Sequence, residues 1–336
     1  MDLETLCQIP ALSGDEYELH DYLENHYKKQ GLTIAKDKLG SVFGESLVHD
    51  SPFKVMISAN LDENGGMVQE LRKDGLLDFV TIGLYQKADF LNQRICLLKR
   101  HHERVYGYVL KKGEDYLLDI GARSLAELKD WQIQIGDTFV LDIPARLNES
   151  GHLLSKNIAN RVGLYLSQQI MSEVQGSLPY DLAIGGISQS LVGTRGAITA
   201  TNRIKPDLAL VFDAAPVEDY QEKTLYLRHF DKTLLPNLKL LATLKKVALA
   251  SGFQVKAQIQ DTGTDGAFIH KTRIGAPTVV VVIPLQHSNS FVQSIHIDDL
   301  DPIRTSIVAF LRLLNEQMLA EMAFQDRIGD GDGSSH

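Results

Sequence analysis

Cysteine is scarce in this sequence. Only Cys7 and Cys96 occur among 336 residues, and they lie far apart in the chain. Their scarcity excludes a disulfide framework and a paired-cysteine metal site, and it is typical of a protein in a reducing compartment. The first residues, MDLETLCQIPALSGDE, begin acidic and lack a basic segment followed by an apolar core. We therefore expect a cytoplasmic protein.

Long apolar runs and an excess of basic charge are also missing. No uninterrupted apolar run reaches the length of a membrane-spanning helix, so we expect no membrane partner. The formal net charge is −9, and no basic block is present that could hold a nucleic acid. With 44% hydrophobic and 23% charged residues, the composition is that of an ordinary globular protein with one large and one smaller domain.

The chain divides into two kinds of sequence. Residues 1–66 and 155–323 alternate apolar strand patterns with helical patterns, which predicts an α/β domain with a mostly parallel sheet flanked by helices. Residues 67–154 carry short strand patterns separated by Gly, Asp and Asn, which predicts an inserted small β-barrel or sandwich. Residues 324–336 are polar and glycine-rich, and we expect a disordered tail there.

Local patterns place several elements within the α/β part. Ser13 with Glu16 three residues later forms a capping box, which predicts a helix over residues 14–29. The alternation over residues 32–46 predicts a hairpin. One amphipathic helix is expected over residues 302–322.

Six polar segments follow the predicted strands or begin the predicted helices of the α/β part. They are residues 59–65, 155–163, 188–197, 212–219, 261–268 and 283–290. Open α/β sheets place their chemistry at the carboxyl ends of strands. The order of these segments, their split by a β-rich insertion and the letters NRVG, VGTRGA, GTDGA and GAPT resemble the glutamyl and tetrahedral-type deblocking aminopeptidases, a family of dinuclear metallopeptidases. The resemblance covers nearly the whole chain and implies a zinc-peptidase-like fold whose insertion mediates oligomerisation.

The resemblance also implies where two divalent cations, zinc or cobalt, would be held. Asp213 keeps the family's carboxylate at a strand end, and Asp62 keeps the one that orients the first histidine ligand. Ser190 stands where the family has its general base. The remaining ligand positions fall on Asn60, Ala159, Leu191 and Asn289. Such a set cannot offset the charge of two dications, so we expect no metal cofactor and interpret the chain as a non-catalytic homologue.

Several side chains leave alternatives open. His287 is a candidate substitute ligand with Asp62 and Asp213, and the chain would then be an active metal-dependent aminopeptidase or hydrolase acting on peptide N-termini through a rebuilt site. The two carboxylates could equally serve structure by accepting backbone N–H bonds. Thr264 and Asp265 are candidates for binding a ligand in the cleft, and Asp265 could instead cap the next helix.

Expected partners follow from the non-catalytic interpretation. We expect the chain to associate with itself or with an active relative. The former cleft would bind a peptide or small molecule, or would be closed if the chain is a purely structural subunit.

Overall fold

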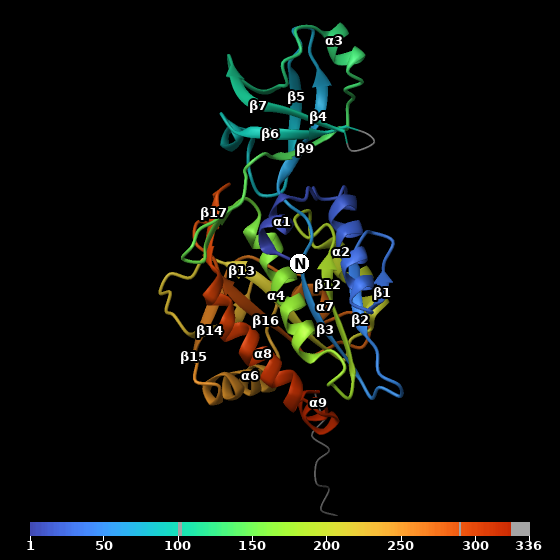
Figure 1. Ribbon diagram of the computed structural model, residues 1–336, viewed down its shortest axis with the longest axis vertical. Coiled ribbons are helices and arrows are strands. Elements are labelled where there is room, and N and C mark those ends of the chain that lie inside the picture. Colours follow the sequence, from blue (N-terminus) through green and yellow to red (C-terminus); the bar gives the residue numbers. More distant parts are fainter. Residues whose placement is uncertain (100–102, 289, 324–336) are drawn as a thin grey trace, which may run out of the picture.

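The computed structural model describes residues 1–99, 103–288 and 290–323. Asn289 and the expected tail at 324–336 therefore lie outside the described residues. The ribbon shows a larger α/β body and a smaller β body stacked along the long axis of the molecule (Figure 1). Within the described ranges, none of the helices has the length and hydropathy that crossing a lipid bilayer requires.

An eight-stranded sheet forms the centre of the larger body, in the order β1-β2-β12-β3-β13-β16-β14-β15. Its strands are β1 (Thr33–Lys36), β2 (Val42–Ser46), β3 (Lys54–Asn60), β12 (Asp181–Ile187), β13 (Leu208–Ala215), β14 (Thr224–Asp231), β15 (Gln254–Gln260) and β16 (Thr278–Pro284). The four central strands β12, β3, β13 and β16 run parallel, whereas β2 and β14 pair with them antiparallel. The predicted fold class, a mostly parallel sheet flanked by helices, is confirmed.

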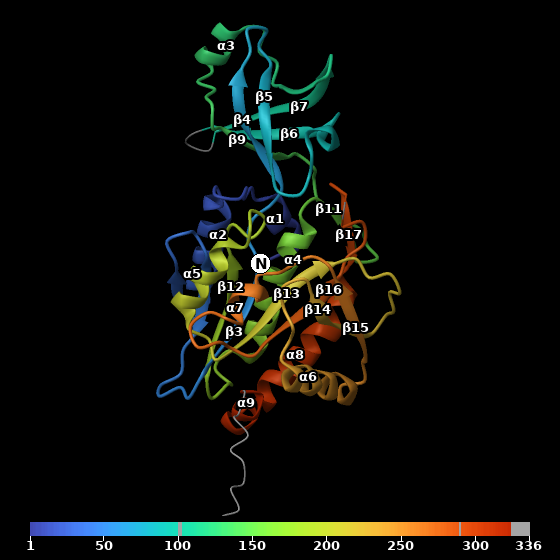
Figure 2. The ribbon, with the colours of Figure 1, turned by 180° about the vertical axis from the view of Figure 1, so that it is seen from behind.

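Helices cover both faces of this sheet. They are α1 (Leu3–Gln8), α2 (Tyr17–Lys29), α4 (Ile158–Val174), α5 (Arg195–Ile204), α6 (Leu238–Ala250), α7 (Gly266–Ile269), α8 (Asp301–Leu313) and α9 (Glu316–Met322), with a 3-10 turn η2 (Ile297–Leu300). Val55 and Ile57 of β3 face the core shared with α2, α4, α6 and α8, and Met56 faces the core shared with α5 and α7. The second of these layers is visible from behind (Figure 2). A strand buried on both faces needs such consecutive apolar residues.

The smaller body is a closed barrel with the order β4-β5-β8-β7-β6-β9. Its elements are β4 (Gly65–Leu71), β5 (Leu77–Ile82), β6 (Arg94–Leu98), β7 (Arg104–Lys112), β8 (Asp115–Asp119), β9 (Thr138–Leu141), α3 (Leu125–Asp130) and a 3-10 turn η1 (Lys87–Phe90). The predicted inserted β-barrel is thus present. The chain returns through a small sheet of β10 (Arg146–Leu147), β11 (His152–Ser155) and β17 (Gln293–His296).

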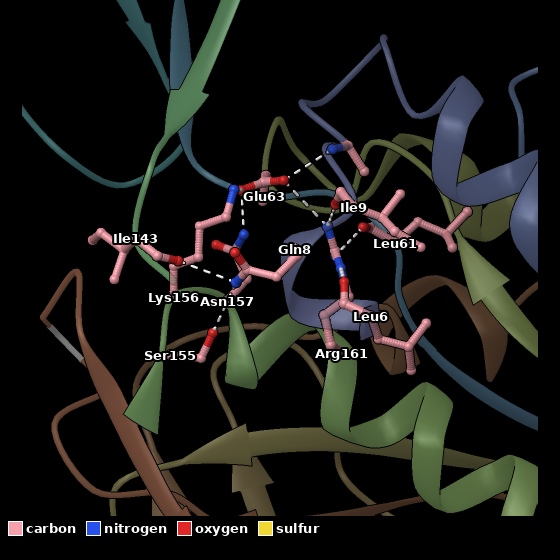
Figure 3. A network of polar contacts seen from close by, with 11 residues as sticks. Leu6, Gln8, Ile9, Leu61, Glu63, Ile143, Ser155, Lys156, Asn157 and Arg161 are labelled. Carbon is pink, nitrogen blue, oxygen red and sulfur yellow. Dashed lines mark hydrogen bonds and ion pairs between the residues drawn. The ribbon is translucent and has the colours of Figure 1, made fainter. Parts of the chain in front are cut away.

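A buried ion network lies where the chain leaves the larger body for the barrel and returns from it (Figure 3). Glu63, fully buried between β3 and β4, accepts a hydrogen bond from the Ala11 backbone at 2.9 Å. Its other oxygen binds the Lys156 ammonium at 3.0 Å and the Asn157 side-chain amide. These contacts join segments from three parts of the chain around one carboxylate.

Arg161 of α4 completes this network. Its guanidinium is fully buried, lies 3.4 Å from Glu63, and donates hydrogen bonds to the backbone carbonyls of Leu6, Ile9 and Leu61. A buried guanidinium needs such partners because losing water is costly for a charge. The network therefore fixes the N-terminal segment and the strand end at Asn60 against α4.

The predicted start of the second helix is wrong by three residues. The helix α2 begins at Tyr17 rather than at residue 14, because Gly14 has a left-handed φ of +87°. Ser13 does not cap it. Its hydroxyl instead donates to Asp62 at 2.5 Å, so a long-range carboxylate has replaced the local capping box.

The single helix predicted over 302–322 is also wrong, since it is divided into α8 and α9. The side chain of Asn315 accepts a hydrogen bond from the Met318 backbone at 3.0 Å and begins α9 as its N-cap. Asparagine is a strong capping residue, which explains why the chain starts a new helix here.

Candidate functional site

A cavity of about 520 Å³ lies at the carboxyl ends of β3, β12 and β13. This is the edge of the sheet where the polar segments were predicted to gather. Among the residues that line it are Asn60, Ala159, Asn160, Ser190, Leu191, Asp213, Lys232, Gln260, Asp261, Thr264, Asp265, Ser288 and Gln293. Polar segments that are distant in sequence thus meet around one cavity, which is the cleft expected from the sequence.

Asn60 ends β3 and lines the cavity, whereas Asp62 lies fully buried just beyond it. One Asp62 oxygen accepts hydrogen bonds from the Ser13 hydroxyl and, at 2.8 Å, from the Leu191 backbone. Its other oxygen is buried without a hydrogen-bond partner among the described residues. Burial raises the pKa of Asp62, and these hydrogen bonds oppose the shift. The carboxylate thus fixes two loops at the cavity, as the structural alternative expected.

Ser190 and Leu191 follow β12 and line the opposite side of the cavity. The Ser190 hydroxyl donates to Asp265 at 2.6 Å. Leu191 presents an isobutyl group to a cavity whose other residues are mostly polar. An apolar group at this position offers no ligand atom to a cation.

Asp265 and Thr264 line the cavity on the loop before α7, and neither caps that helix. Asp265 stands at the N-cap position without a side-chain capping bond, and the Thr264 hydroxyl donates to Asp231 at 2.7 Å. The second Asp265 oxygen is buried without a partner in the described part of the chain. Burial raises the pKa of Asp265 to about 7, the Ser190 hydrogen bond lowers it, and Asp62 and Asp213 raise it further. The capping alternative is therefore wrong for Asp265.

Asp213 lies near the end of β13 with its side chain 24% exposed at the cavity. The Arg228 guanidinium of β14 donates to it at 2.8 Å. Burial raises the pKa of Asp213, and the charge and hydrogen bond of Arg228 oppose the shift. Asp213, the carboxylate at an expected ligand position, is therefore already paired with Arg228.

Ala159 and Gln293 face the cavity from α4 and β17. The backbone N–H of Ala159 donates to the Gln293 side chain at 2.9 Å, and the amide of Gln293 donates to the Ser288 carbonyl. Ser288 lines the cavity, whereas the neighbouring His287, in a left-handed conformation with φ of +55°, does not. Within the described part of segment 283–290, Ser288 thus lines the cavity, and Gln293 of β17 adds an amide beside it.

The barrel also reaches the cavity. Leu84 and Tyr85, on the loop between β5 and η1, line it. The Tyr85 ring lies 4.3 Å from that of Phe291, and Phe291 lies 4.9 Å from Phe90 in the barrel core. Aromatic contacts at these distances are stabilising, so the loop before β17 is anchored in the barrel.

The residues present do not fit a dinuclear metal centre. At the cavity, the positions expected for ligands offer an amide at Asn60, a methyl at Ala159, an isobutyl at Leu191 and a carboxylate at Asp213 that is paired with Arg228. Within the described ranges, three ligand-type side chains come close together only at His20, Asp21 and Glu24 on the outer surface of α2. Two cations need several carboxylate and imidazole ligands.

Replacing Asp265 by Asn is expected to remove part of the pH dependence of stability. Because folding raises the pKa of this carboxyl from 3.8 to about 7, the folded chain holds a proton between these pH values that the unfolded chain has lost. This group therefore makes the folded state less stable as the pH rises through that window. Asp265→Asn should become more stable relative to the native chain as the pH increases, as measured by urea unfolding at several pH values.

Asp261→Asn is the matched control for this prediction, because Asp261 lines the same cavity but is exposed. Its stability relative to the native chain should stay constant over the same pH values. A pH trend that is equal in both variants would show that Asp265 is not the group responsible.

Several residues at the site were not anticipated from the sequence. Among them, Arg228, Gln258 and Gln293 interact with residues that line the cavity or line it themselves, and Tyr85 reaches it from the barrel. The sequence feature that could have pointed to Arg228 is its place within the apolar segment of β14. That strand was not predicted.

Comparison with known proteins points to one family. A sequence profile described as M42 glutamyl aminopeptidase matches residues 40–305. The glutamyl aminopeptidase of Lactococcus lactis is 28% identical to this chain, covering 95% of this chain and 98% of its own length. The structure of a TET aminopeptidase from a marine sediment archaeon of the Thaumarchaeota superposes with a TM-score of 0.88 at 24% identity, covering 96% of this chain and 98% of the other. The Pyrococcus horikoshii TET1 peptidase gives a TM-score of 0.83 at 18% identity, covering 93% and 98%.

Proposed function

Because the chain belongs to the M42 glutamyl aminopeptidase family, we propose that it is a member without the dinuclear metal centre and without peptidase activity. The observation that carries this proposal is the set of side chains at the cavity. Asn60, Ala159 and Leu191 offer an amide, a methyl and an isobutyl group, and Ser190 offers a hydroxyl where a proton acceptor is needed. Neutral groups of this kind neither balance two dications nor take a proton from an attacking water.

Metal analysis of the purified chain tests this proposal directly. We expect much less than one zinc, cobalt or manganese ion per chain after equilibration with each metal, and no release of N-terminal residues from aminoacyl test substrates. The glutamyl aminopeptidase of Lactococcus lactis serves as the positive control under the same conditions. Stoichiometric metal together with turnover would overturn the proposal.

The retained role that we propose is binding within an assembly. The Pyrococcus horikoshii relative is described as assembling into a tetrahedron or a large octahedral shell, and its fold is shared across nearly all of this chain. We infer that this chain also associates with itself or with an active relative, and that the cavity of about 520 Å³ accepts a peptide or another small polar molecule. Sedimentation of the purified chain should give a mass well above that of one 37.3 kDa chain; a monomer would contradict self-association.

A working hydrolase is the alternative that one observation favours. Asp265 combines a pKa of about 7 with a place at the cavity wall, and a carboxyl of that kind suits a general acid or base. The same substrate assay separates the two proposals when it is repeated with a chelator and with Asp265→Asn. Turnover that survives chelation and is lost in Asp265→Asn would support the alternative.

A further inference from the structure

The Asp213–Arg228 ion pair lies at the cavity wall. In the described part of the chain, Arg228 is the one cationic side chain in an ion pair with a carboxylate that lines the cavity. The other two such carboxylates, Asp261 and Asp265, form no ion pair there. We propose that the Arg228 guanidinium is a built-in cation that holds Asp213 in place of a metal ion. This inference rests on the proposed absence of the dinuclear centre.

Arg228 is held in a fixed position. Its side chain is 1% exposed, and its Nε and Nη2 atoms donate to the Gln258 side-chain oxygen at 3.1 and 2.8 Å. Gln258 in turn donates to the Pro216 carbonyl at 2.9 Å. The guanidinium is thus clamped between β13 and β15 by bonds to all three of its nitrogens. A planar donor group fixed in this way is pre-organised for a carboxylate.

The local backbone helps to bring Arg228 to this position. The pairing of β14 with β15 shifts register between Arg228 and Phe230, which is the irregularity of a β-bulge. Bulges redirect side chains and are common beside functional sites. The Arg228 side chain is directed toward Asp213 of β13, whereas its neighbours His229 and Phe230 are exposed.

The pair disfavours a cation at Asp213 for two reasons. A metal ion at Asp213 would lie close to a fixed positive charge, and the repulsion would be strong where water is largely excluded. Moving Arg228 away would bury its guanidinium without a counter-charge, which is costly. Arg228 therefore both supplies the positive charge that Asp213 needs and weakens the binding of a second cation there, so it acts as a positioning residue for Asp213.

Chemical rescue provides the test in an otherwise native chain. Arg228→Ala leaves Asp213 without its counter-charge and leaves a space of the shape of the lost group. We expect the Tm to fall by about 5–10 °C, as when one partner of a buried ion pair is removed. Methylguanidinium, far below the concentrations at which guanidinium salts unfold proteins, should recover a clear part of that loss. Equal concentrations of sodium chloride or urea should not.

Two further variants decide whether the rescue is specific. Arg228→Ala combined with Asp213→Asn also removes the negative charge of Asp213, so methylguanidinium should not raise the Tm of this variant. Arg203→Ala is the matched control, because Arg203 is exposed and its side chain donates to the backbone carbonyl of Lys36. No recovery in Arg228→Ala, or equal recovery in all three variants, overturns the inference. Metal found in the native chain would instead overturn the proposed function, so the two failures are distinguishable.

Discussion

A chain that carries Asn60→His, Ala159→Asp, Ser190→Glu, Leu191→Glu and Asn289→His is expected to bind about two divalent ions and to release N-terminal residues from peptides, whereas we propose that the native chain does neither. The four described positions of this set already line one cavity, and the backbone there is tied by buried contacts such as that of Leu191 with Asp62. The five substitutions therefore add ligand atoms to a cavity whose backbone is already held in place. Metal content after dialysis and turnover with zinc, cobalt or manganese measure the result.

The restored chain should also become dependent on metal for its stability. A glutamate at position 190 would lie beside Asp265, which now accepts the Ser190 hydrogen bond at 2.6 Å, and carboxylates this close repel one another unless a cation is present. We expect its Tm to fall with a chelator and to rise with added metal. The matched control carries Ser190→Gln and Leu191→Gln with the other three changes, and should bind no metal pair. Metal binding in neither chain would show that the positions are wrongly matched.

Arg228 is expected to limit this restoration. If the guanidinium competes with a cation for Asp213, adding Arg228→Met to the five changes should tighten metal binding by about tenfold or more, because a fixed positive charge beside the ligand is removed. Titration calorimetry of the two restored chains measures the difference. Equal or weaker affinity in the chain with Arg228→Met would show that the pair serves stability alone.

Glu63→Gln is expected to destabilise the chain by about 3–5 kcal/mol, because it leaves two buried cations without a counter-charge. Glu63 is fully buried and is shared by Lys156 at 3.0 Å and Arg161 at 3.4 Å. Glutamine keeps the size of the side chain, so the loss would reflect charge rather than a cavity. Urea unfolding monitored by far-UV circular dichroism provides the measurement.

Lys156→Met is the matched control for Glu63→Gln. It removes one cation and leaves Glu63 paired with Arg161, so each remaining buried charge still has a partner. The loss of stability should therefore be clearly smaller than for Glu63→Gln. Equal losses for the two variants would indicate that packing of the Lys156 stem, rather than charge balance, dominates at this junction.

The sequence predicts those parts of the fold that local patterns determine. The run Val55–Ala59 indicates a strand buried on both faces, and the short strands after residue 67 indicate a separate β structure; both are present. The strand β14 was missed because its residues Thr224–Asp231 mix apolar side chains with an arginine and a histidine. Arg228 is buried there because Asp213 and Gln258, on two other strands, accept its hydrogen bonds. A pattern confined to one segment cannot show such a partner.

The site shows the same division between local and long-range effects. The polar segments around Asn60, Ser190 and Asp213 could be located because each follows an apolar strand. What these residues touch could not be predicted. Ser13 fits a capping box locally, yet its hydroxyl binds Asp62, and Tyr85 reaches the cavity only because the barrel is placed above it. Such contacts depend on the assembled fold.

The strand order of the central sheet has a consequence for the time course of folding. β12 lies between β2 and β3, although it follows the whole barrel in the chain, with Asp181 paired to Lys54. During synthesis, β2 and β3 must therefore wait with unpaired edges until the ribosome has passed the insertion. Non-local pairings of this kind are slow and expose surfaces to aggregation. The barrel, closed within its own contiguous segment, can finish folding during that interval and bring its two ends together before β12 is made.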